Sequence, residues 1–286
     1  MEDACRRRQE RATHLRKGLI SRSGSPAWSP DGTEIAYAAS QHQIAAVAST
    51  GGQPRVVTSG EGISTAPHWS PDGDYLAFAW NQSSKDINIW TVPAVGGEPE
   101  PVTLTTKPAT MPRWSPDGEY IAYTLGSQIG ISLEDIWTVP SSGGRPVRLT
   151  THPARDLFPL WLAGGKDLAF LSNRNQEATW LYDLWTVPVE DGKARMFFSR
   201  ASGTLNRPSI SPDGKQIAYS TGNNVGDTLY VASLASGKER LIGRGTLPSF
   251  SPDGRRVAYY LGGDTRPSIW VADVSRIVRF NPNPEL

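Results

Sequence analysis

Histidine side chains are the first candidates for chemistry, because imidazole serves as acid, base and metal ligand near neutral pH. The chain has four histidines, His14, His42, His68 and His152, in four unrelated contexts and never at the spacing of metal ligands. It also has no G-x-S-x-G, H-E-x-x-H, Walker or G-x-G-x-x-G motif. We therefore predict no catalytic residues, no metal and no cofactor, although three histidines from distant segments could still assemble a metal site.

Carboxylates recur at regular spacing and could form an acidic ring. They are Asp31, Asp72, Asp117, Asp213 and Asp253. Each follows Ser-Pro and precedes Gly, a turn sequence in which Pro presets φ, Asp accepts local hydrogen bonds and Gly adopts a positive φ. We interpret these aspartates as turn residues rather than as a catalytic or metal-binding set.

Length and composition limit the classes of function. The 286 residues include 28 Gly and 23 Pro, which indicates many turns, and 29 basic against 28 acidic residues. This balance does not favour nucleic-acid binding by the folded part, and no apolar stretch reaches the ~20 residues that a membrane span needs. The single cysteine, Cys5, excludes an internal disulfide. The first residues have charges but no apolar core, so no export signal is predicted.

A repeat of roughly 45 residues runs through the chain. Its first element, Trp-Ser-Pro-Asp-Gly or a relaxed copy, begins at Trp28, Trp69, Trp114, Trp161, Ile210 and Phe250. Each copy is followed by an apolar stretch such as EIAY or YLAF, and later by a stretch such as IWTVP and usually a Gly-rich turn. Each unit therefore predicts four short strands, A to D, with the Ser-Pro-Asp-Gly turn between A and B.

Six units of four antiparallel strands predict an all-β fold, a six-bladed β-propeller. We expect the propeller to span residues 18–286, with blades starting near residues 26, 67, 112, 159, 208 and 248. Large aromatic residues at fixed repeat positions suit packing between blades, so we interpret eight tryptophans as core rather than as a ligand cage. They are Trp28, Trp69, Trp114, Trp161, Trp90, Trp137, Trp185 and Trp270.

The N-terminal stretch needs a separate interpretation. Residues 1–17 are charged and have few apolar side chains, which predicts a flexible arm. An alternative is that this Arg-rich stretch contacts an upstream domain or nucleic acid. Leu19-Ile20-Ser21 follows the arm at the place where an outer strand would precede blade 1, and it could complete blade 6 and close the ring.

The WSPDGxxIAY and IWTVPxxGG pattern resembles the repeat of bacterial TolB-type β-propellers, relatives of the WD repeat, over about residues 19–281. The resemblance is specific for the fold and not for the function, because the same repeat occurs in TolB proper, in prolyl-oligopeptidase-like and tricorn-like peptidases, in sugar lyases and in sensor modules. The resemblance implies a periplasmic protein, whereas the absence of a predicted export signal favours the cytoplasm or a truncated start. From the sequence we expect neither the α/β domain of TolB proper nor the hydrolase domain of the peptidases.

Propeller topology puts the A–B and C–D turns on one face, and the B–C loops and D–A crossings on the other. The turns are nearly identical, whereas the loops vary, and binding residues concentrate on loops of a rigid scaffold. We therefore place a candidate binding site on the B–C/D–A face. Two tryptophans outside the repeat positions, Trp80 and Trp180, fall in its B–C loops. The alternative is that these two side chains only cover their own loops. The candidate residues of the site are Trp80, Arg174, Trp180, His68, Arg113, Arg155, Asp156 and Arg207.

The predicted function is a non-catalytic scaffold or sensor module that binds a protein or peptide through this face. We expect a monomer whose propeller neither binds nucleic acid nor inserts into a membrane. One alternative is a propeller enzyme, a sugar lyase or hydrolase, that uses His68 or His152 with a nearby Arg in the axial channel. Another alternative is a sensor module detached from a larger kinase or regulator.

Overall fold

The Ser-Pro-Asp-Gly segments form the tight turns that the sequence predicts. In the first copy, the amide of Gly32 donates to the carbonyl oxygen of Ser29 at 2.9 Å, and Gly32 has a φ of 71°. The Ser29 hydroxyl donates to the carboxylate of Asp31 at 2.6 Å. The same serine–aspartate bond is present in the other four intact copies. The recurring aspartates are therefore turn residues, as predicted.

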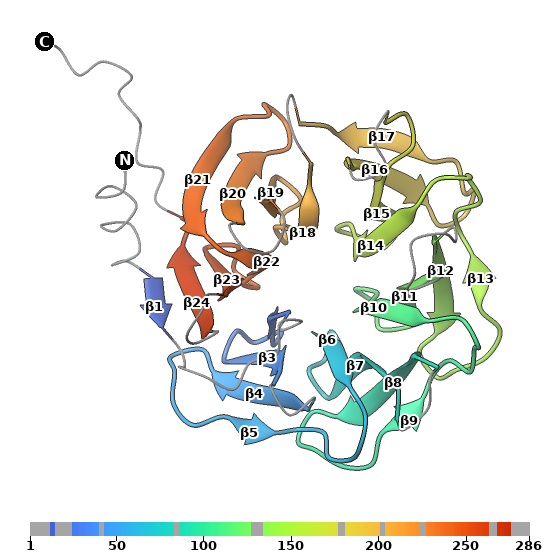
Figure 1. Ribbon diagram of the computed structural model, residues 1–286, viewed down its shortest axis with the longest axis vertical. Coiled ribbons are helices and arrows are strands. Elements are labelled where there is room, and N and C mark those ends of the chain that lie inside the picture. Colours follow the sequence, from blue (N-terminus) through green and yellow to red (C-terminus); the bar gives the residue numbers. More distant parts are fainter. Residues whose placement is uncertain are drawn as a thin grey trace, which may run out of the picture.

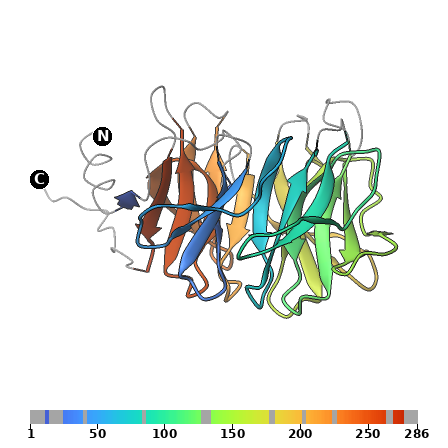
Figure 2. The same cartoon turned by 90° about the horizontal axis from the view of Figure 1, so that it is seen from below.

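The computed structural model describes residues 12–14, 25–39, 43–82, 86–126, 134–176, 181–200, 204–222, 227–262 and 268–275. Within these ranges the chain forms six four-stranded antiparallel sheets. The sheets stand as blades around a common centre (Figure 1), and the side view shows them next to one another in a single layer (Figure 2). The predicted six-bladed all-β propeller is confirmed. No helix in the same ranges is long and apolar enough to cross a bilayer.

The first three blades follow one another along the chain, each from its inner to its outer strand. Blade 1 has β2 (Ala27–Trp28), β3 (Glu34–Ala38), β4 (Ile44–Ala48) and β5 (Arg55–Val56). Blade 2 has β6 (Ser64–Trp69), β7 (Tyr75–Trp80), β8 (Asn88–Pro93) and β9 (Glu100–Pro101). Blade 3 has β10 (Ala109–Trp114), β11 (Tyr120–Leu125), β12 (Asp135–Pro140) and β13 (Val147–Arg148).

The last three blades repeat this order, except for the outer strand of blade 6. Blade 4 has β14 (Asp156–Trp161), β15 (Asp167–Ser172), β16 (Asp183–Pro188) and β17 (Arg195–Phe198). Blade 5 has β18 (Asn206–Ile210), β19 (Gln216–Thr221), β20 (Thr228–Ser233) and β21 (Glu239–Arg244). Blade 6 has β22 (Thr246–Phe250), β23 (Arg256–Leu261), β24 (Ser268–Asp273) and β1 (Ala12–His14).

The outer strand of blade 6 comes from the other end of the chain. β1 pairs antiparallel with β24, with Ala12 opposite Ala272. This strand lies within residues 1–17, which the sequence predicts as an arm. Leu19-Ile20-Ser21, the predicted closing strand, lies outside the described residues, and the structure gives its expected place to Ala12–His14. The ring is closed by pairing the two ends of the chain in one sheet.

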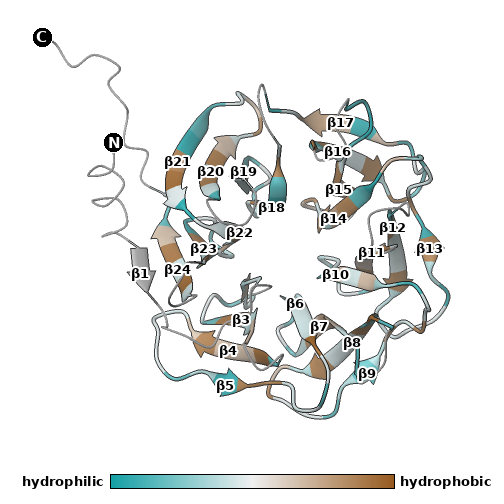
Figure 3. Cartoon of the chain, in the orientation of Figure 1, coloured by the Kyte–Doolittle hydropathy of each residue, from teal (hydrophilic) through white to brown (hydrophobic). Residues whose placement is uncertain are grey.

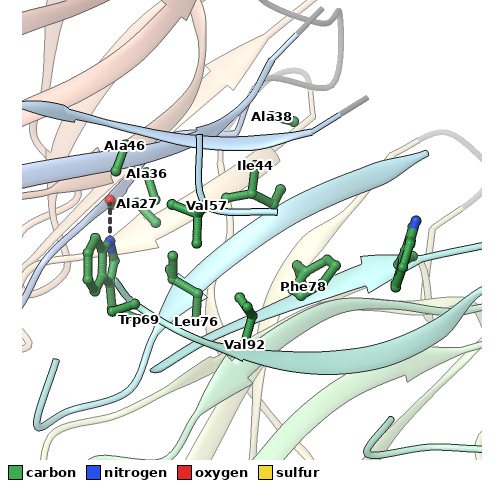
Figure 4. Close-up of a cluster of buried hydrophobic side chains, with 12 residues drawn as sticks. Ala27, Ala36, Ala38, Ile44, Ala46, Val57, Trp69, Leu76, Phe78 and Val92 are labelled. Atoms are coloured by element: carbon green, nitrogen blue, oxygen red, sulfur yellow. Dashed lines mark hydrogen bonds between the residues drawn. The ribbon is translucent and has the colours of Figure 1, made fainter. Parts of the chain in front are cut away.

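The hydrophobic core lies between neighbouring blades. Between blades 1 and 2, Ala36 and Ile44 pack with Leu76 and Phe78, all fully buried (Figure 4). Equivalent clusters occupy the other five interfaces. Seven repeat tryptophans belong to these clusters, which confirms their packing role: Trp28, Trp69, Trp90, Trp114, Trp137, Trp161 and Trp185. Hydrophilic residues lie on outer strands such as β5 and β9 (Figure 3).

The inner strands of blades 2 to 6 share a bulge beside a proline. The bulge residues have φ values between 50° and 56° although none is glycine: Ala66, Met111, Phe158, Arg207 and Leu247. Each directly precedes a proline, and the strand register shifts at this point. A bulge bends its strand and re-aims the neighbouring side chains. In every blade, the residue that follows the proline lines the channel.

Candidate binding site in the central channel

A cavity of about 410 Å³ occupies the channel at the end where the A–B turns lie. All six blades contribute to its wall through their inner strands; in blade 2 the wall runs from Pro67 to Pro71. No B–C loop residue in the described ranges lines it. The hollow thus lies toward the face opposite the one on which the sequence places the binding site.

The wall carries one channel residue per blade, directly after the proline of the bulge. These residues are Ala27, His68, Arg113, Leu160, Ser209 and Ser249. The repeat tryptophans of blades 1 to 4 also line the cavity, so the prediction that they are core only was incomplete. The channel position differs in chemistry from blade to blade, and it places His68 and Arg113 on neighbouring inner strands.

Hydrogen bonds between blades hold this ring of residues in place. The indole Nε1 of Trp69 donates to the carbonyl oxygen of Ala27 at 3.1 Å (Figure 4). Trp161 donates in the same way to the Arg113 carbonyl oxygen at 3.0 Å. Trp28 donates to the carbonyl oxygen of Ser249 at 3.1 Å, across the interface that closes the ring. The backbone carbonyl groups of Ala27, Arg113 and Ser249 are therefore held in place before any ligand binds.

His68 is held in one tautomer. The backbone N–H of Trp114 donates to Nδ1 of His68 at 3.2 Å, so the ring proton resides on Nε2. Burial, together with the nearby positive charge of Arg113, lowers the pKa of His68 to about 3. The imidazole is therefore neutral at physiological pH and offers the cavity an N–H donor.

Among the residues that the structure describes, Arg113 is the only charged side chain in the cavity wall. Its guanidinium donates to the carbonyl oxygen of Pro112 at 2.8 Å, and within the described ranges it forms no ion pair. Burial lowers the pKa of Arg113 to about 10, so it stays protonated at neutral pH. The cavity therefore holds one positive charge without a carboxylate beside it.

The other charged residues that the sequence nominates pair with one another or with neighbours. Arg155 forms a two-point ion pair with Glu134, in which its NH2 group lies 3.0 Å from Oε1. Asp156, which is fully buried, accepts from Arg174 at 2.7 Å and from Ser172 at 2.6 Å. Burial nevertheless raises the pKa of Asp156. These pairs join strand A of blade 4 to neighbouring segments and leave little charge for a partner.

Of the remaining nominated residues, Trp80 and Arg207 lie in the described ranges, and neither is fully exposed. Trp80 is only 5% exposed, packs edge-on against Trp90 with ring centroids 5.0 Å apart, and donates to the Glu61 carbonyl oxygen at 3.0 Å. Its indole therefore lies against the D–A crossing into blade 2, which contains Glu61. Arg207 is partly buried at its bulge, and burial lowers its pKa. Trp180 lies outside the described residues.

The two histidines whose side chains the structure describes, His68 and His152, lie on different segments of the chain. His152 is exposed on the crossing into blade 4, far along the sequence from His68, and His42 lies outside the described residues. In the part of the chain that the structure describes, no three His, Cys, Asp or Glu side chains are grouped as metal ligands.

We expected His68 and Arg113 near the D–A crossings, but they line the cavity near the A–B turns. Ser209, Ser249 and Leu160 lie in the same ring and were not among the predicted binding residues. A signal was present, because a proline stands two residues before the Trp, Ile or Phe in all six repeats. A proline inside a strand indicates an edge or a bulge, and here it marks the residue that lines the channel.

Known proteins resemble this chain in sequence repeat and in fold. The TolB beta propeller domain family matches residues 19–181. No curated protein matches the sequence. A protein from Agrobacterium tumefaciens assigned as TolB superposes with a TM-score of 0.70 at 21% identity, covering 87% of this chain and 89% of that one. TolB from Acinetobacter baumannii gives 0.69 at 19% identity, over 88% of this chain and 61% of that one.

A structure of different activity is also similar. An oligogalacturonate lyase in complex with manganese gives a TM-score of 0.63 at 13% identity, with 92% of each chain covered. At these identities the structural similarity shows the fold alone. The family match, in contrast, extends over more than half of the sequence and follows the repeat that builds the blades. The chain therefore belongs to the TolB β-propeller domain family.

Proposed function

We propose that the chain is a non-catalytic binding module that holds a segment of a protein or peptide partner at the A–B end of its channel. The observation that supports this is the cavity of about 410 Å³ with walls from all six blades. Its volume falls within the range of roughly 300–1,000 Å³ that is usual for ligand sites. Because the wall is already fixed by inter-blade hydrogen bonds, most of the ordering cost of binding falls on the partner.

The chemistry of the wall suits a peptide segment. Indole and proline rings, such as those of Trp69, Trp161 and Pro71, provide apolar contact area. His68 and Ser249 add polar groups that can meet a peptide backbone or a polar side chain. Apolar surface with a few polar groups is typical of sites that bind organic ligands.

A propeller enzyme is the second candidate. His68 and Arg113 lie on neighbouring strands of the channel, and a protein of similar fold is an oligogalacturonate lyase. However, the hydrogen bond from Trp114 occupies Nδ1 of His68, and a pKa of about 3 makes this imidazole a poor base at neutral pH. Both features favour binding over catalysis at this site.

A randomised heptapeptide library provides the test. The library is passed over the wild type, over Ser249→Trp, which fills the cavity, and over the control Val147→Trp. Val147 is 55% exposed on the outer strand β13, so its replacement leaves the channel open. All three proteins are first compared by circular dichroism and thermal unfolding.

We expect the wild type and Val147→Trp to retain the same peptides, and Ser249→Trp to bind them at least about 10-fold more weakly, because the indole occupies their volume. Equal retention by Ser249→Trp would contradict the proposed site. Turnover of oligogalacturonate by the wild type, lost in His68→Gln, would instead support the enzyme.

A further inference from the structure

The guanidinium of Arg113 lies in the cavity wall and forms no ion pair with any residue in the described ranges. Five arginines in the described ranges form ion pairs within 3 Å: Arg55, Arg148, Arg155, Arg174 and Arg200. Arg113 has one hydrogen bond, to the carbonyl oxygen of Pro112. A guanidinium carries five N–H donors in a planar fork that fits a carboxylate, so most of this capacity remains for a ligand.

The surroundings of Arg113 do not supply a counter-charge. No Asp or Glu side chain from the described part of the chain lines the cavity. A charge that is partly removed from water is costly unless it is paired, and this cost appears as the lowered pKa of Arg113. An anion in the cavity would offset the cost. The neighbouring His68 adds a neutral N–H donor that does not compete for the anion's charge.

The rim of the same end carries the opposite charge. Five A–B turns place their aspartates there, next to the prolines that line the cavity: Asp31, Asp72, Asp117, Asp213 and Asp253. These carboxylates are exposed, and hydrogen bonds from the turn serines lower their pKa values, so they are ionised at neutral pH. Lys215 lies 3.9 Å from Asp213, and the charges of Arg256 and Arg255 also lower the pKa of Asp253, so basic side chains stand at two of these five turns.

The positive charge inside the cavity and the acidic side chains at its rim favour a peptide carboxylate over a small free anion. A small free anion has to pass the acidic rim, which acts over a Debye length of about 8 Å at physiological salt. A peptide with basic residues beside its carboxylate is attracted by the rim and by Arg113 at once. The charge pattern therefore matches a ligand that is basic outside and anionic at its buried end.

We infer that the cavity receives a carboxylate of the bound peptide, its C-terminal carboxylate, which pairs with the guanidinium of Arg113 while basic residues just before it lie against the aspartates of the rim. This inference rests on the proposed function, because it names the group that occupies the same cavity. Nothing in the ion pair requires movement of the wall, since the Arg113 backbone is held by Trp161.

The test uses four sets of heptapeptides on the full chain. The peptides end in either a free carboxylate or an amide, and carry either two Lys or two Glu residues before the last residue. The other positions are randomised among uncharged residues. We expect the wild type to bind the carboxylate set with Lys at least about 10-fold more tightly than the amide set with Lys, because only the carboxylate pairs with Arg113.

Variants of Arg113 test whether its charge causes the preference for carboxylate peptides, and a thermal unfolding measurement tests whether each variant is folded. Arg113→Gln should reduce the carboxylate-over-amide preference to less than about 2-fold, whereas Arg113→Lys should keep a weaker preference because it keeps the charge. Arg145→Gln, an exposed site in the same blade, removes the same charge away from the cavity and should leave the preference intact.

Distinct results would overturn distinct claims. Equal binding of carboxylate and amide peptides that is still lost in Ser249→Trp would reject the carboxylate and leave the binding site standing. Tighter binding of the Glu sets than of the Lys sets would reject the role of the rim. Displacement of the peptides by inorganic phosphate beyond the effect of chloride at equal ionic strength would identify a free-anion site. Retention of no peptide at all would reject both proposals.

Discussion

The backbone N–H of Trp114 in blade 3 donates a hydrogen bond to Nδ1 of His68 in blade 2, at 3.2 Å. A side chain of one blade thereby completes the hydrogen bonding of the next inner strand. The same bond fixes the His68 tautomer beside the charge of Arg113. One contact thus serves the stability of the ring and the chemistry of the channel.

The first prediction concerns the pH dependence of stability. In the folded protein the pKa of His68 is about 3, below its usual value near 6.5. Between these two pH values the unfolded chain binds a proton at His68 that the folded chain does not bind. The contribution of His68 to the free energy of unfolding is therefore fully present above about pH 6.5 and is lost as the pH is lowered toward 3. One such proton contributes a slope of about 1.4 kcal/mol per pH unit.

Urea unfolding of the wild type and His68→Gln between pH 3.5 and 7.5 measures this slope. The glutamine side chain can accept the Trp114 N–H but does not titrate, so the variant should lose about one proton's worth of pH dependence. His152→Gln, at an exposed position, should retain the wild-type slope. Identical slopes for wild type and His68→Gln would contradict the prediction.

The second prediction compares two indoles at the same repeat position. Nε1 of Trp69 donates to the Ala27 carbonyl oxygen, whereas Nε1 of Trp114 is buried without a partner in the structure. Trp69→Phe should therefore lose about 0.5–1.5 kcal/mol more stability than Trp114→Phe, because only the former removes a hydrogen bond. Chemical denaturation of the two variants tests this. A larger loss in Trp114→Phe would show that ring size, and not the hydrogen bond, decides the cost.

The repeat made the blade count and the blade interfaces predictable. Trp28 and Trp69 occupy the same position in successive repeats of the sequence. Residues at the same repeat position occupy equivalent places in successive blades of the ring. The depth of a residue along the channel does not follow from this period. His68 and Arg113 were assigned to the loop face because they lie near the D–A crossings in sequence. The bulge at the preceding proline turns them into the cavity wall near the A–B turns.

Contacts between side chains that are distant in sequence could not be predicted from the sequence either. Trp80 looked like an exposed anchor because it ends strand B beside a variable loop, but its ring folds onto Trp90. Arg155 looked available until the structure placed Glu134 beside it. Burial and pairing depend on the neighbouring strand and crossing, and single-sequence patterns do not report these contacts.

The third prediction concerns the interface between blades 4 and 5, where Ile210 takes the place of the repeat tryptophan. Arg200, on the crossing between these blades, donates to Glu239 at 2.8 and 3.1 Å, and its guanidinium lies 4.9 Å from the centre of the Tyr230 ring. Arg200→Ala should reduce the free energy of unfolding by about 1–3 kcal/mol, since it removes a forked ion pair and a cation–π contact.

Arg200→Lys should lose about half as much free energy of unfolding as Arg200→Ala, because a lysine ammonium cannot donate two parallel hydrogen bonds to the Glu239 carboxylate. The control is Arg195→Ala, at an exposed position on β17, which should change stability by less than about 0.5 kcal/mol. The hydrogen bond from Arg200 also lowers the pKa of Glu239. The stabilisation should accordingly fade in acid as that carboxylate becomes protonated. Equal losses for the alanine variants of Arg200 and Arg195 would show that the fork adds nothing.

The last prediction concerns two glycines two residues apart at the junction of blades 5 and 6. A Cβ added to Gly245, whose φ is 149°, would lie 2.4 Å from Cδ2 of Tyr259 and 3.1 Å from the carbonyl oxygen of Tyr260. A Cβ at Gly243 would meet nothing within 4 Å. Gly245→Ala should therefore destabilise the fold by about 2 kcal/mol or more, because the Tyr259 ring is buried and cannot move aside without cost. Gly243→Ala should be neutral or slightly stabilising, since it only restricts the unfolded chain. Urea unfolding of both variants decides the matter, and equal effects would mean that the chain at this junction adjusts more freely than its close contact with Tyr259 suggests.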